Sequence, residues 1–376
     1  MNPRISRFID EHRPPTPCLV LDLDVVAERY EELRTALPDA AVYYAVKANP
    51  EPAVLRRLVG LGASFDVASP GEVDMALAAG APPARISYGN TIKKQRDIAY
   101  AYARGVRLFA FDSVDELEKL AVAAPGASVF CRILAAGEGA DWPLSRKFGC
   151  EPAMAADLLR TAATLGLDPC GVSFHVGSQQ RDPGQWDRPL AEAAALFVSL
   201  AASGVRLRLV NLGGGFPAHY LAAVPEIGRY GDAIDESVGR HFGTNRPSLI
   251  VEPGRYLAGD AGVLCSEVVL VSRKAHGEER RWVFLDAGVF GGLAETLGES
   301  IKYRIRTSVD GGATGPVVIA GPTCDSMDVL YQAHEYHLPE ALRPGDRVMF
   351  LSAGAYTRSY CSVGFNGFEP LPVFCA

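Results

Sequence analysis

The sequence predicts an α/β protein in which a (β/α)8 barrel is followed by a second, smaller β-domain. Two observations support this prediction. From about residue 40 to residue 255, short β-rich runs alternate with helical stretches, which is typical of parallel strands joined by crossover helices. Beyond residue 256 helical stretches become rare, and short strands separated by turns follow one another. A doubly wound open sheet is the alternative for the first part of the chain.

The barrel is assigned to residues 23–255, because about eight strand–helix units fall within it. The predicted strands are, in order, VYYAVKAN, ASFDVAS, RISYGN, RLFAFDS, SVFCRI, GVSFHVGS, RLVNLGGGFP and SLIVEPGRY. Helical stretches such as EPAVLRRLVGLG and EPAMAADLLRTAATLG lie between them, and several close on glycine, as helix C-termini often do. A (β/α)8 barrel typically takes about 250 residues, so the length of this region fits.

The β-domain is predicted to be discontinuous. Its later strands are VLCSEVVLVSRKA, RRWVFLDAG, YRIRTSV, GPVVIAGPTC and DRVMFLSAGAY. The early run TPCLVLDL precedes the first barrel unit and can join these strands. We therefore assign residues 1–22 and 256–376 to the β-domain.

The composition argues against several classes of function. Lys and Arg total 37 against 44 Asp and Glu, for a net charge of −7, and no basic run is present, so we expect no nucleic-acid surface. The first residues, MNPRISRFIDEHRPPTP, lack the apolar core of a signal peptide, and no apolar run is long enough to span a bilayer. The eight cysteines are scattered without a metal-like spacing. We therefore expect a cytoplasmic protein that binds neither a metal nor a membrane.

Polar residues and glycines fall at the ends of the predicted strands. In barrels of this kind, catalytic groups lie at the C-terminal ends of the strands. The strand ends here offer Lys47, Asp66, Asn90, Arg132, His175, Ser178, Gly213, Gly214, Gly215, Glu252 and Arg255. Such a convergent set, drawn from many strands, predicts an active site at this end of the barrel.

Four of these features have both a structural and a chemical interpretation. Lys47 either reaches solvent or is held as an amine that reacts with a carbonyl. The glycines of LGGGFP either allow a tight turn or bring backbone N–H groups close to a phosphate. His175 is either a structural histidine or a flat ring that stacks on a heterocycle. Glu252 pairs either with a local base such as Arg255 or with a protonated ring nitrogen.

Together the chemical interpretations describe a site for pyridoxal 5'-phosphate (PLP). The lysine would hold the aldehyde of PLP as a Schiff base, and the protonated pyridine would accept electrons from a carbanion at the substrate's α-carbon. The glycine-rich turn and EPGRYL follow adjacent late strands, where barrels commonly bind phosphate. Neither a metal triad nor a Gly-x-Ser-x-Gly motif competes with this interpretation.

Seven motifs in the chain resemble those of one known family, and they occur in the family's order. They are YYAVKANP, FDVAS, HVGSQ, GGGFP, EPGRYL, GPTCDSMD, and GAYT with FNGF. Extending from about Pro17 to Phe368, they are similar to the fold-type III PLP-dependent amino-acid decarboxylases. The closest group resembles the ornithine decarboxylases, including bacterial forms that also accept lysine. The resemblance implies a PLP-binding barrel, a C-terminal β-domain, and a head-to-tail homodimer with two active sites at the interface.

The resemblance also implies roles for individual residues. Lys47 would be the Schiff-base lysine, Glu252 would pair with the pyridine nitrogen, and His175 would stack on the cofactor ring. Asp66 and Arg132 would line the same pocket. The phosphate or its surroundings would be held by Ser178, Gly214, Gly215, Gly254, Arg255 and Tyr356.

Cys324 and Asp325, in GPTCDSMD, would be supplied by the partner subunit. By resemblance, the cysteine helps to protonate the carbanion left after CO2 departs, and the aspartate receives the distal ammonium of the substrate. A carboxylate at the far end of a pocket selects a cationic tail, which fits this assignment. Taken alone, Cys324 could instead be a small buried apolar residue.

The chain departs from eukaryotic-type members in the segment GGLAETLGESIKY, which lacks their tyrosine–aspartate pair. Glu295 or Glu299 would then supply a second acidic contact to the substrate amine, and we assign Glu295 to this contact. The implied reaction is decarboxylation of L-ornithine to putrescine in polyamine biosynthesis. Decarboxylation of L-lysine to cadaverine is also expected, because one methylene typically changes discrimination by only ~1–3 kcal/mol.

Three alternatives remain on the same fold. A diaminopimelate decarboxylase usually has Cys-Glu in place of Cys324 and Asp325, and its substrate's distal carboxylate would meet a like charge here. A catalytically inactive regulator would be expected to have lost Lys47, Glu252 or Cys324, and all three are present. An alanine-racemase-like enzyme is the third alternative, and the decarboxylase motifs fit the chain better.

Overall fold

The structure, a computed structural model, describes residues 2–142, 146–364, 366 and 369–376. The chain forms two compact units. The first, which we call the β-domain, comprises Met1–Val26, Ala218–Ala223 and Leu257–Ala376. The second, which we call the barrel, comprises Ala27–Pro217 and Val224–Tyr256. Each unit is therefore assembled from segments that are far apart in the sequence, and residues 218–223 lie in the β-domain although we expected them in the barrel.

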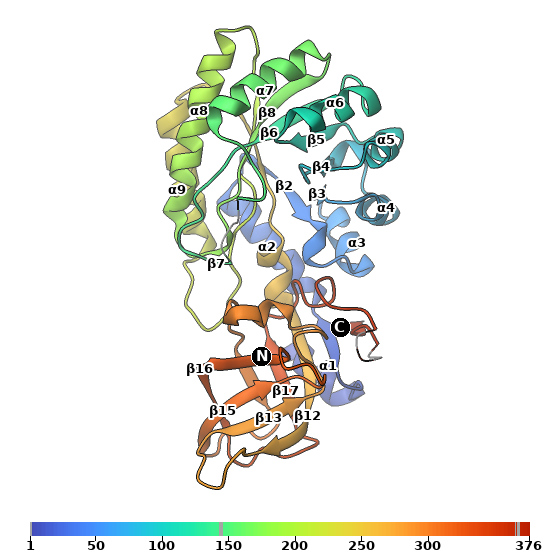
Figure 1. Cartoon of the computed structure of the whole chain (residues 1–376), viewed down its shortest axis with the longest axis vertical. Coiled ribbons are helices and arrows are strands. Elements are labelled where there is room, and N and C mark those ends of the chain that lie inside the picture. Colours follow the sequence, from blue (N-terminus) through green and yellow to red (C-terminus); the bar gives the residue numbers. More distant parts are fainter. Residues whose placement is uncertain (1, 143–145, 365, 367–368) are drawn as a thin grey trace. The chain divides into compact units, whose positions relative to one another are not determined.

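The barrel is a closed ring of parallel strands with helices between them (Figure 1). Its strands are β2 (Ala40–Ala45), β3 (Ser64–Val67), β4 (Ile86–Tyr88), β5 (Leu108–Phe111), β6 (Ser128–Arg132), β8 (Asp168–Ser173), β10 (Leu209–Asn211) and β11 (Ser248–Val251). They pair in the order β10-β11-β2-β3-β4-β5-β6-β8, which closes the ring. This arrangement confirms the predicted (β/α)8 barrel and excludes the open sheet.

The helices of this part of the chain are α2 (Leu23–Ala36), α3 (Pro52–Gly60), α4 (Pro70–Ala78), α5 (Gln95–Ala103), α6 (Val114–Ala123), α7 (Pro152–Thr164), α8 (Asp187–Ala201), α9 (Ile227–Phe242) and the short α10 (Arg255–Ala258). Local sequence explains several of their ends. Ser69 and Ser113 cap α4 and α6 by accepting the N–H groups of Glu72 (3.2 Å) and Glu116 (3.4 Å). Glycines with positive φ follow α3, α4, α5 and α7, as their sequences predict. Outside the ring, β7 (Ala140–Trp142) and β9 (Ser178–Gln180) form a two-stranded antiparallel pair.

An apolar layer inside the barrel supports the strand ends. Its buried members are Ala110, Phe130, Cys170, Leu209 and Ile250. Residues two positions apart in a strand point to the same side. Four of these apolar side chains are therefore each followed, on the same side, by a polar side chain nearer the carboxyl end of the barrel. These polar residues are Asp112, Arg132, Asn211 and Glu252.

The β-domain is an eight-stranded sheet. Its strands are β1 (Cys18–Leu21), β12 (Gly262–Ser272), β13 (Arg281–Leu285), β14 (Ile305–Thr307), β15 (Thr314–Ala320), β16 (Val329–Pro339), β17 (Arg347–Leu351) and β18 (Val373–Cys375). Six of them run in the order β14-β17-β12-β13-β15-β16, while β1 pairs with both β12 and β18. Because β1 pairs antiparallel with β12, with Cys18 opposite Cys265, the predicted discontinuity of the β-domain is confirmed.

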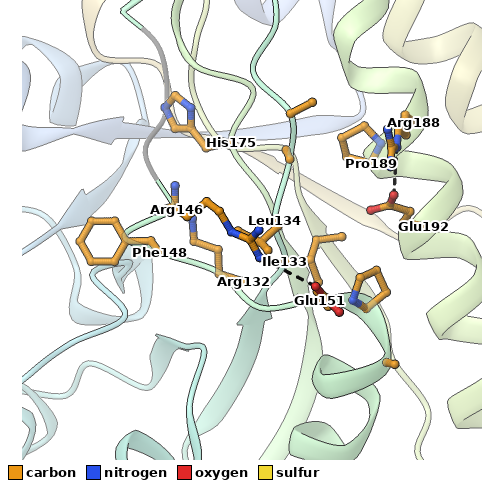
Figure 2. Close-up of a pocket in the computed structure, with 14 residues that line it drawn as sticks. Arg132, Ile133, Leu134, Arg146, Phe148, Glu151, His175, Arg188, Pro189 and Glu192 are labelled. Carbon is orange, nitrogen blue, oxygen red and sulfur yellow. Dashed lines mark hydrogen bonds and ion pairs between the residues drawn. The ribbon is translucent and has the colours of Figure 1, made fainter.

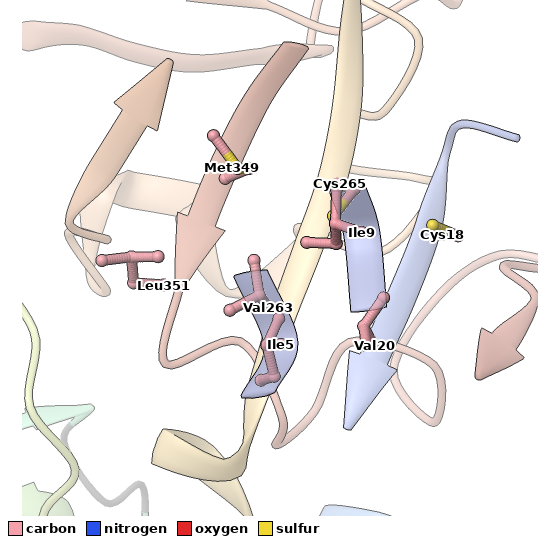
Figure 3. Close-up of a cluster of buried hydrophobic side chains, with 8 residues drawn as sticks. All are labelled: Ile5, Ile9, Cys18, Val20, Val263, Cys265, Met349 and Leu351. Carbon is pink, nitrogen blue, oxygen red and sulfur yellow. The ribbon is translucent and has the colours of Figure 1, made fainter. Parts of the chain in front are cut away.

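The N-terminal helix α1 (Pro3–His12) packs on this sheet (Figure 3). Ile5 and Ile9 from α1 belong to one buried cluster with apolar residues of β1, β12 and β17. The other members of the cluster are Cys18, Val20, Val263, Cys265, Met349 and Leu351. Residues 1–22 thus contribute a helix as well as a strand to the β-domain.

Among residues 2–142, 146–364, 366 and 369–376, no helix combines the length and apolar character needed to cross a membrane. In the same ranges, no group of three or more His, Cys, Asp or Glu side chains is arranged to hold a metal ion.

Candidate active site

The stretch 42–50 places Lys47 at the carboxyl end of the barrel strands. β2 ends at Ala45, and the short helix η1 (Val46–Ala48) follows it directly. The Ala45 N–H donates to the carbonyl of Pro253 (3.1 Å), which ties this turn to the end of the neighbouring strand β11. Lys47 is exposed, and its charge lowers the pKa values of nearby carboxyls. The lysine therefore lies where a strand-end catalytic group of a barrel is expected.

Glu252 is held in place by Asn211. The Asn211 side-chain amide donates to Glu252 Oε1, and its oxygen accepts the Gly213 N–H (2.9 Å). The Glu252 N–H donates to the Gly213 carbonyl (2.8 Å), so the carboxylate and the glycine turn form one bonded unit. Burial raises the pKa of Glu252, while Asn211, Lys47 and Arg132 oppose that shift. A carboxylate in this setting is suited to pair with a cationic group.

Asp66 carries a polar atom that the protein leaves unsatisfied. The side chain is buried, and its Oδ1 has no hydrogen-bond partner among the described residues. Burial and the nearby Glu252 carboxylate raise the pKa of Asp66 well above its ordinary value. Gly89 is needed beside it, because a Cβ there would lie 2.1 Å from Oδ1. An orphaned buried oxygen of this kind indicates that a further group belongs at the site.

His175 is a neutral ring in this environment. Burial lowers its pKa well below the ordinary value, and the cationic Arg132 and Lys47 lower it further. The Gly177 N–H donates to Nδ1 (3.0 Å), so the neutral ring carries its proton on Nε2. Gly214 lies close to the ring, because a Cβ on it would be 3.3 Å from Nε2. The neutral imidazole therefore lies close to the glycine turn.

The glycine turn after β10 depends on the absence of side chains. Gly213 and Gly215 have φ values of +67° and +113°. A Cβ on Gly214 would lie 2.6 Å from the carbonyl oxygen of Glu252, and one on Gly215 would lie 2.6 Å from that of Gly177. The turn therefore packs tightly against the ends of two neighbouring strands.

A hydroxyl and a guanidinium meet beside this turn. Arg255 is buried, and its Nε and one terminal nitrogen each donate to Ser178 Oγ at 3.2 Å. Gly254, also buried, precedes Arg255. Glycine backbone, a hydroxyl and a guanidinium are the donors that bind phosphate. These features are those expected of a phosphate-binding turn.

At the carboxyl end of the barrel the structure thus brings together Lys47, Asp66, Arg132, His175, Ser178, Gly214, Gly215, Glu252, Gly254 and Arg255. Asn90, also expected at a strand end, has a different neighbour. Its carbonyl accepts a hydrogen bond from the buried Lys93 Nζ (2.6 Å), which also pairs with Glu116 (3.0 Å). Burial lowers the pKa of Lys93 to about 8. These contacts attach the loop after β4 to α6.

A cavity of about 600 Å³ adjoins the strand ends (Figure 2). Arg132 and His175 line it, together with the segment after β6 and the facing residues of α7 and α8. Two ion pairs occur among its lining residues, Arg146 with Glu151 (3.8 Å) and Arg188 with Glu192 (3.2 Å). The cavity is large enough for an amino acid beside Arg132 and His175.

The remaining predicted residues belong to the β-domain. Cys324 and Asp325 lie on the loop between β15 and β16, and both are exposed. The Cys324 thiol lies 3.7 Å from the side-chain oxygen of Asn366, and Asp325 accepts the N–H of Met327 (2.8 Å). Exposure removes the alternative in which Cys324 is a buried apolar residue. The FNGF motif lies outside the described residues except for Asn366.

Glu295 and Glu299, the two candidates for a second acidic contact, have different surroundings in the structure. Glu299, at the end of the 3-10 helix η5 (Ala294–Glu299), accepts N–H groups from Gln332 (2.7 Å), Ala333 (2.6 Å) and His334 (2.7 Å). These three bonds lower its pKa against the effect of burial. The Glu299 carboxylate is therefore bound to the backbone of strand β16. Glu295 is only 4% exposed, and its contact with the substrate amine stays a prediction.

Sequence reasoning missed Asn211 and Asp112, and the pattern of the strands could have found both. Each follows a buried apolar barrel residue by two positions, as Arg132 and Glu252 do. Asp112 accepts the Gly149 N–H (2.8 Å) and fixes the segment that borders the cavity. Asn211, as described above, orients Glu252.

Comparison with known proteins identifies the family. Residues 23–259 match the family model described as pyridoxal-dependent decarboxylase, pyridoxal binding domain. A lysine/ornithine decarboxylase from Selenomonas ruminantium is 37% identical over 361 residues, covering 96% of this chain and 89% of the relative.

Two solved structures share the fold over nearly the whole chain. The lysine/ornithine decarboxylase of Vibrio vulnificus, complexed with cadaverine, has a TM-score of 0.88 at 31% identity. The match covers 99% of this chain and 97% of the chain of that enzyme. The arginine decarboxylase of Paramecium bursaria Chlorella virus, bound to agmatine, has a TM-score of 0.91 at 28% identity and is covered in full, as is this chain. With the site geometry above, these matches place the chain in the pyridoxal-dependent decarboxylase family, as a PLP-dependent amino-acid decarboxylase.

Proposed function

We propose that this chain decarboxylates L-ornithine to putrescine, and L-lysine to cadaverine as a second reaction, in polyamine biosynthesis. The observation that carries the substrate class is the exposed Asp325 carboxylate next to the exposed Cys324 thiol on one loop. A carboxylate there favours a cationic tail, and it opposes the distal carboxylate of diaminopimelate. The cadaverine bound to the Vibrio vulnificus relative supports the same class of substrate.

The barrel residues fit PLP on the evidence of this structure. Asp66 Oδ1 is an unsatisfied buried oxygen, and the buried Arg255 donates to Ser178 Oγ beside the glycine turn, which together offer the donors that a phosphate requires. Lys47 would bind the aldehyde carbon, and Glu252 the ring nitrogen. The phosphate would be held by Ser178, Gly214, Gly215, Gly254 and Arg255, with Tyr356. When bound, PLP supplies an electron sink for the electron pair left at the α-carbon as CO2 departs.

The chain's own groups have separate tasks around that chemistry. Glu252, oriented by Asn211, would keep a proton on the ring nitrogen of PLP through its negative charge. His175, neutral because of burial and nearby cations, would cover the cofactor ring without repelling the protonated ring nitrogen. Asp66 and Arg132 complete the polar layer around Glu252. Cys324 delivers a proton to the α-carbon, while Asp325 and Glu295 bind the distal ammonium.

A second copy of the chain is proposed to complete each active site. Cys324 and Asp325 are exposed, and segments of the β-domain also expose large apolar side chains. These are Leu297, Met327, Tyr360 and Val363. Large exposed apolar groups favour burial against another protein. A head-to-tail homodimer would cover them and bring the β-domain residues to the barrel of the partner.

Mixing two inactive variants tests this shared site. Lys47→Ala subunits and Cys324→Ala subunits are each expected to be impaired alone. After random exchange of equal amounts, about half of the dimers are mixed and each has one intact site, so activity should recover to about one quarter of wild type. The control replaces the second variant by the double variant Lys47→Ala/Cys324→Ala, which cannot restore a site. Absence of recovery after verified subunit exchange contradicts the shared site.

The experiment that tests the proposed function is CO2 release by the PLP-loaded protein with four substrates offered separately. These are L-ornithine, L-lysine, L-arginine and meso-diaminopimelate. We expect the highest kcat/KM with ornithine and a lower value with lysine. Preference for diaminopimelate would overturn the role of Asp325, and preference for arginine would assign a longer cationic substrate. No release with any of the four favours the inactive regulator.

A further inference from the structure

Asp328 is a buried carboxylate at the end of the loop that carries Cys324 and Asp325. It is only 2% exposed. Its Oδ1 accepts the Val289 N–H (2.8 Å), and its Oδ2 accepts both the N–H (2.9 Å) and the hydroxyl (2.7 Å) of Thr323. Both carboxylate oxygens are therefore used, and removing them would leave buried donors unsatisfied.

The surrounding backbone leaves space for this carboxylate. A Cβ added to Gly288 or to Gly321 would lie 2.2 Å from Asp328 Oδ1. Neither glycine is among the residues with positive φ, so backbone conformation does not require them. The Gly321 N–H also donates to the Asp328 carbonyl (2.8 Å), which closes the loop at its base. The two glycines are thus explained by the position of the Asp328 side chain.

The three donors connect segments that carry proposed site residues. Thr323 immediately precedes Cys324. Val289 opens the segment that leads to η5 and Glu295, and the carbonyl of the next residue, Phe290, accepts the Ser362 N–H (3.0 Å). The Asp328 N–H donates in turn to the Asp325 carbonyl (3.1 Å). The Asp328 side chain therefore connects the loop that carries Cys324 and Asp325 to the segment that begins at Val289 and leads to Glu295.

We propose that Asp328 is a positioning residue that sets the place of Cys324 and Asp325. It acts through Thr323 on one side and Val289 on the other, and it is not assigned a contact with substrate or cofactor. The inference rests on the proposed function, because only there do Cys324 and Asp325 act on a substrate. Small displacements matter at such a site, since an error of about 1 Å can cost about 100-fold in rate.

The test compares Asp328→Asn with a matched control, Asp310→Asn. Asp310 accepts the N–H (3.0 Å) and hydroxyl (2.7 Å) of Thr307 in the same domain. Its replacement therefore removes the same kinds of hydrogen bond from the turn after β14, which carries no proposed site residue. In the PLP-loaded dimer we expect Asp328→Asn to lower kcat for ornithine roughly 10- to 100-fold and to raise KM. The rate of Cys324 alkylation by iodoacetamide should change as well. Asp310→Asn should leave all three quantities near wild type.

A milder pair of variants guards against loss of folding. Thr323→Val removes the hydroxyl donor to Asp328 and should reproduce part of the kcat loss and the altered alkylation. Thr323→Ser keeps the hydroxyl and should behave like wild type. If Asp328→Asn does not fold, the comparison of Thr323→Val with Thr323→Ser tests whether Asp328 positions Cys324 and Asp325.

Two outcomes overturn the inference, and one separates it from the proposed function. Unchanged kcat, KM and Cys324 alkylation in folded Asp328→Asn would show that the residue only stabilises the β-domain. Equal kcat and equal Cys324 alkylation rates in Thr323→Val and Thr323→Ser would lead to the same conclusion. If the wild-type protein releases no CO2, the proposed function fails, whereas the alkylation rates still report whether Asp328 sets the position of Cys324.

Discussion

Lys47→Ala is expected to lower CO2 release by at least about 1,000-fold and to end the covalent attachment of PLP. Lys47 supplies the amine at the end of β2, beside the carboxylates of Asp66 and Glu252. Alanine keeps the backbone of η1 and removes only this amine. The visible absorbance of the lysine-bound cofactor should therefore disappear together with activity, while the fold, measured by circular dichroism, stays unchanged.

Lys94→Ala is the matched control for this variant. Lys94 is exposed and lies in the loop that follows β4, the next strand but one after β2. The Lys94→Ala variant therefore removes a lysine near the same end of the barrel. We expect wild-type activity from it. Borohydride reduction of the wild-type protein followed by peptide mapping should place the cofactor on Lys47. A label on another lysine, or retained absorbance and activity in Lys47→Ala, would contradict the assignment.

The barrel could be predicted from sequence because its signal is local and repeated. A polar residue or glycine lies at or just after the end of each strand, and glycines close several helices, so the eight units are visible without any long-range information. The strand-end residues follow from the same logic, since the carboxyl ends of parallel strands meet at one end of a closed barrel. Lys47, His175 and Glu252 were found in this way.

Other parts of the site depend on contacts that no local pattern reports. Glu295 and Glu299 are equivalent in sequence, but only Glu299 meets three backbone donors from β16, more than thirty residues away. Asp328 was overlooked because one of its donors, the Val289 N–H, lies 39 residues away in the sequence. In the fold, helix α1 likewise packs through Ile5 and Ile9 against strands that include the distant β12 and β17. In these cases the role of a residue depends on contacts with segments that are distant in the sequence.

Glu252→Gln is expected to lower kcat by roughly 100-fold or more while PLP stays bound through Lys47. The amide keeps the shape of the side chain and its contact with Asn211, but it lacks the negative charge that holds a proton on the ring nitrogen. Glu192→Gln, at the edge of the 600 Å³ cavity, removes a carboxylate that pairs with Arg188 and serves as the control. We expect the control to retain nearly full kcat.

The pH dependence of kcat distinguishes the charge of Glu252 from its shape. Burial raises the pKa of this carboxyl, so the active anion is present above that pKa and is lost as the pH falls through it. Asn211 lowers the pKa of Glu252, so Asn211→Ala should move the acid limb of the profile to higher pH. In Glu252→Gln the contribution of this group to the limb should vanish. If kcat and the acid limb stayed as in wild type, the ring-nitrogen partner would have to be Asp66, the other buried carboxyl with a raised pKa beside Lys47.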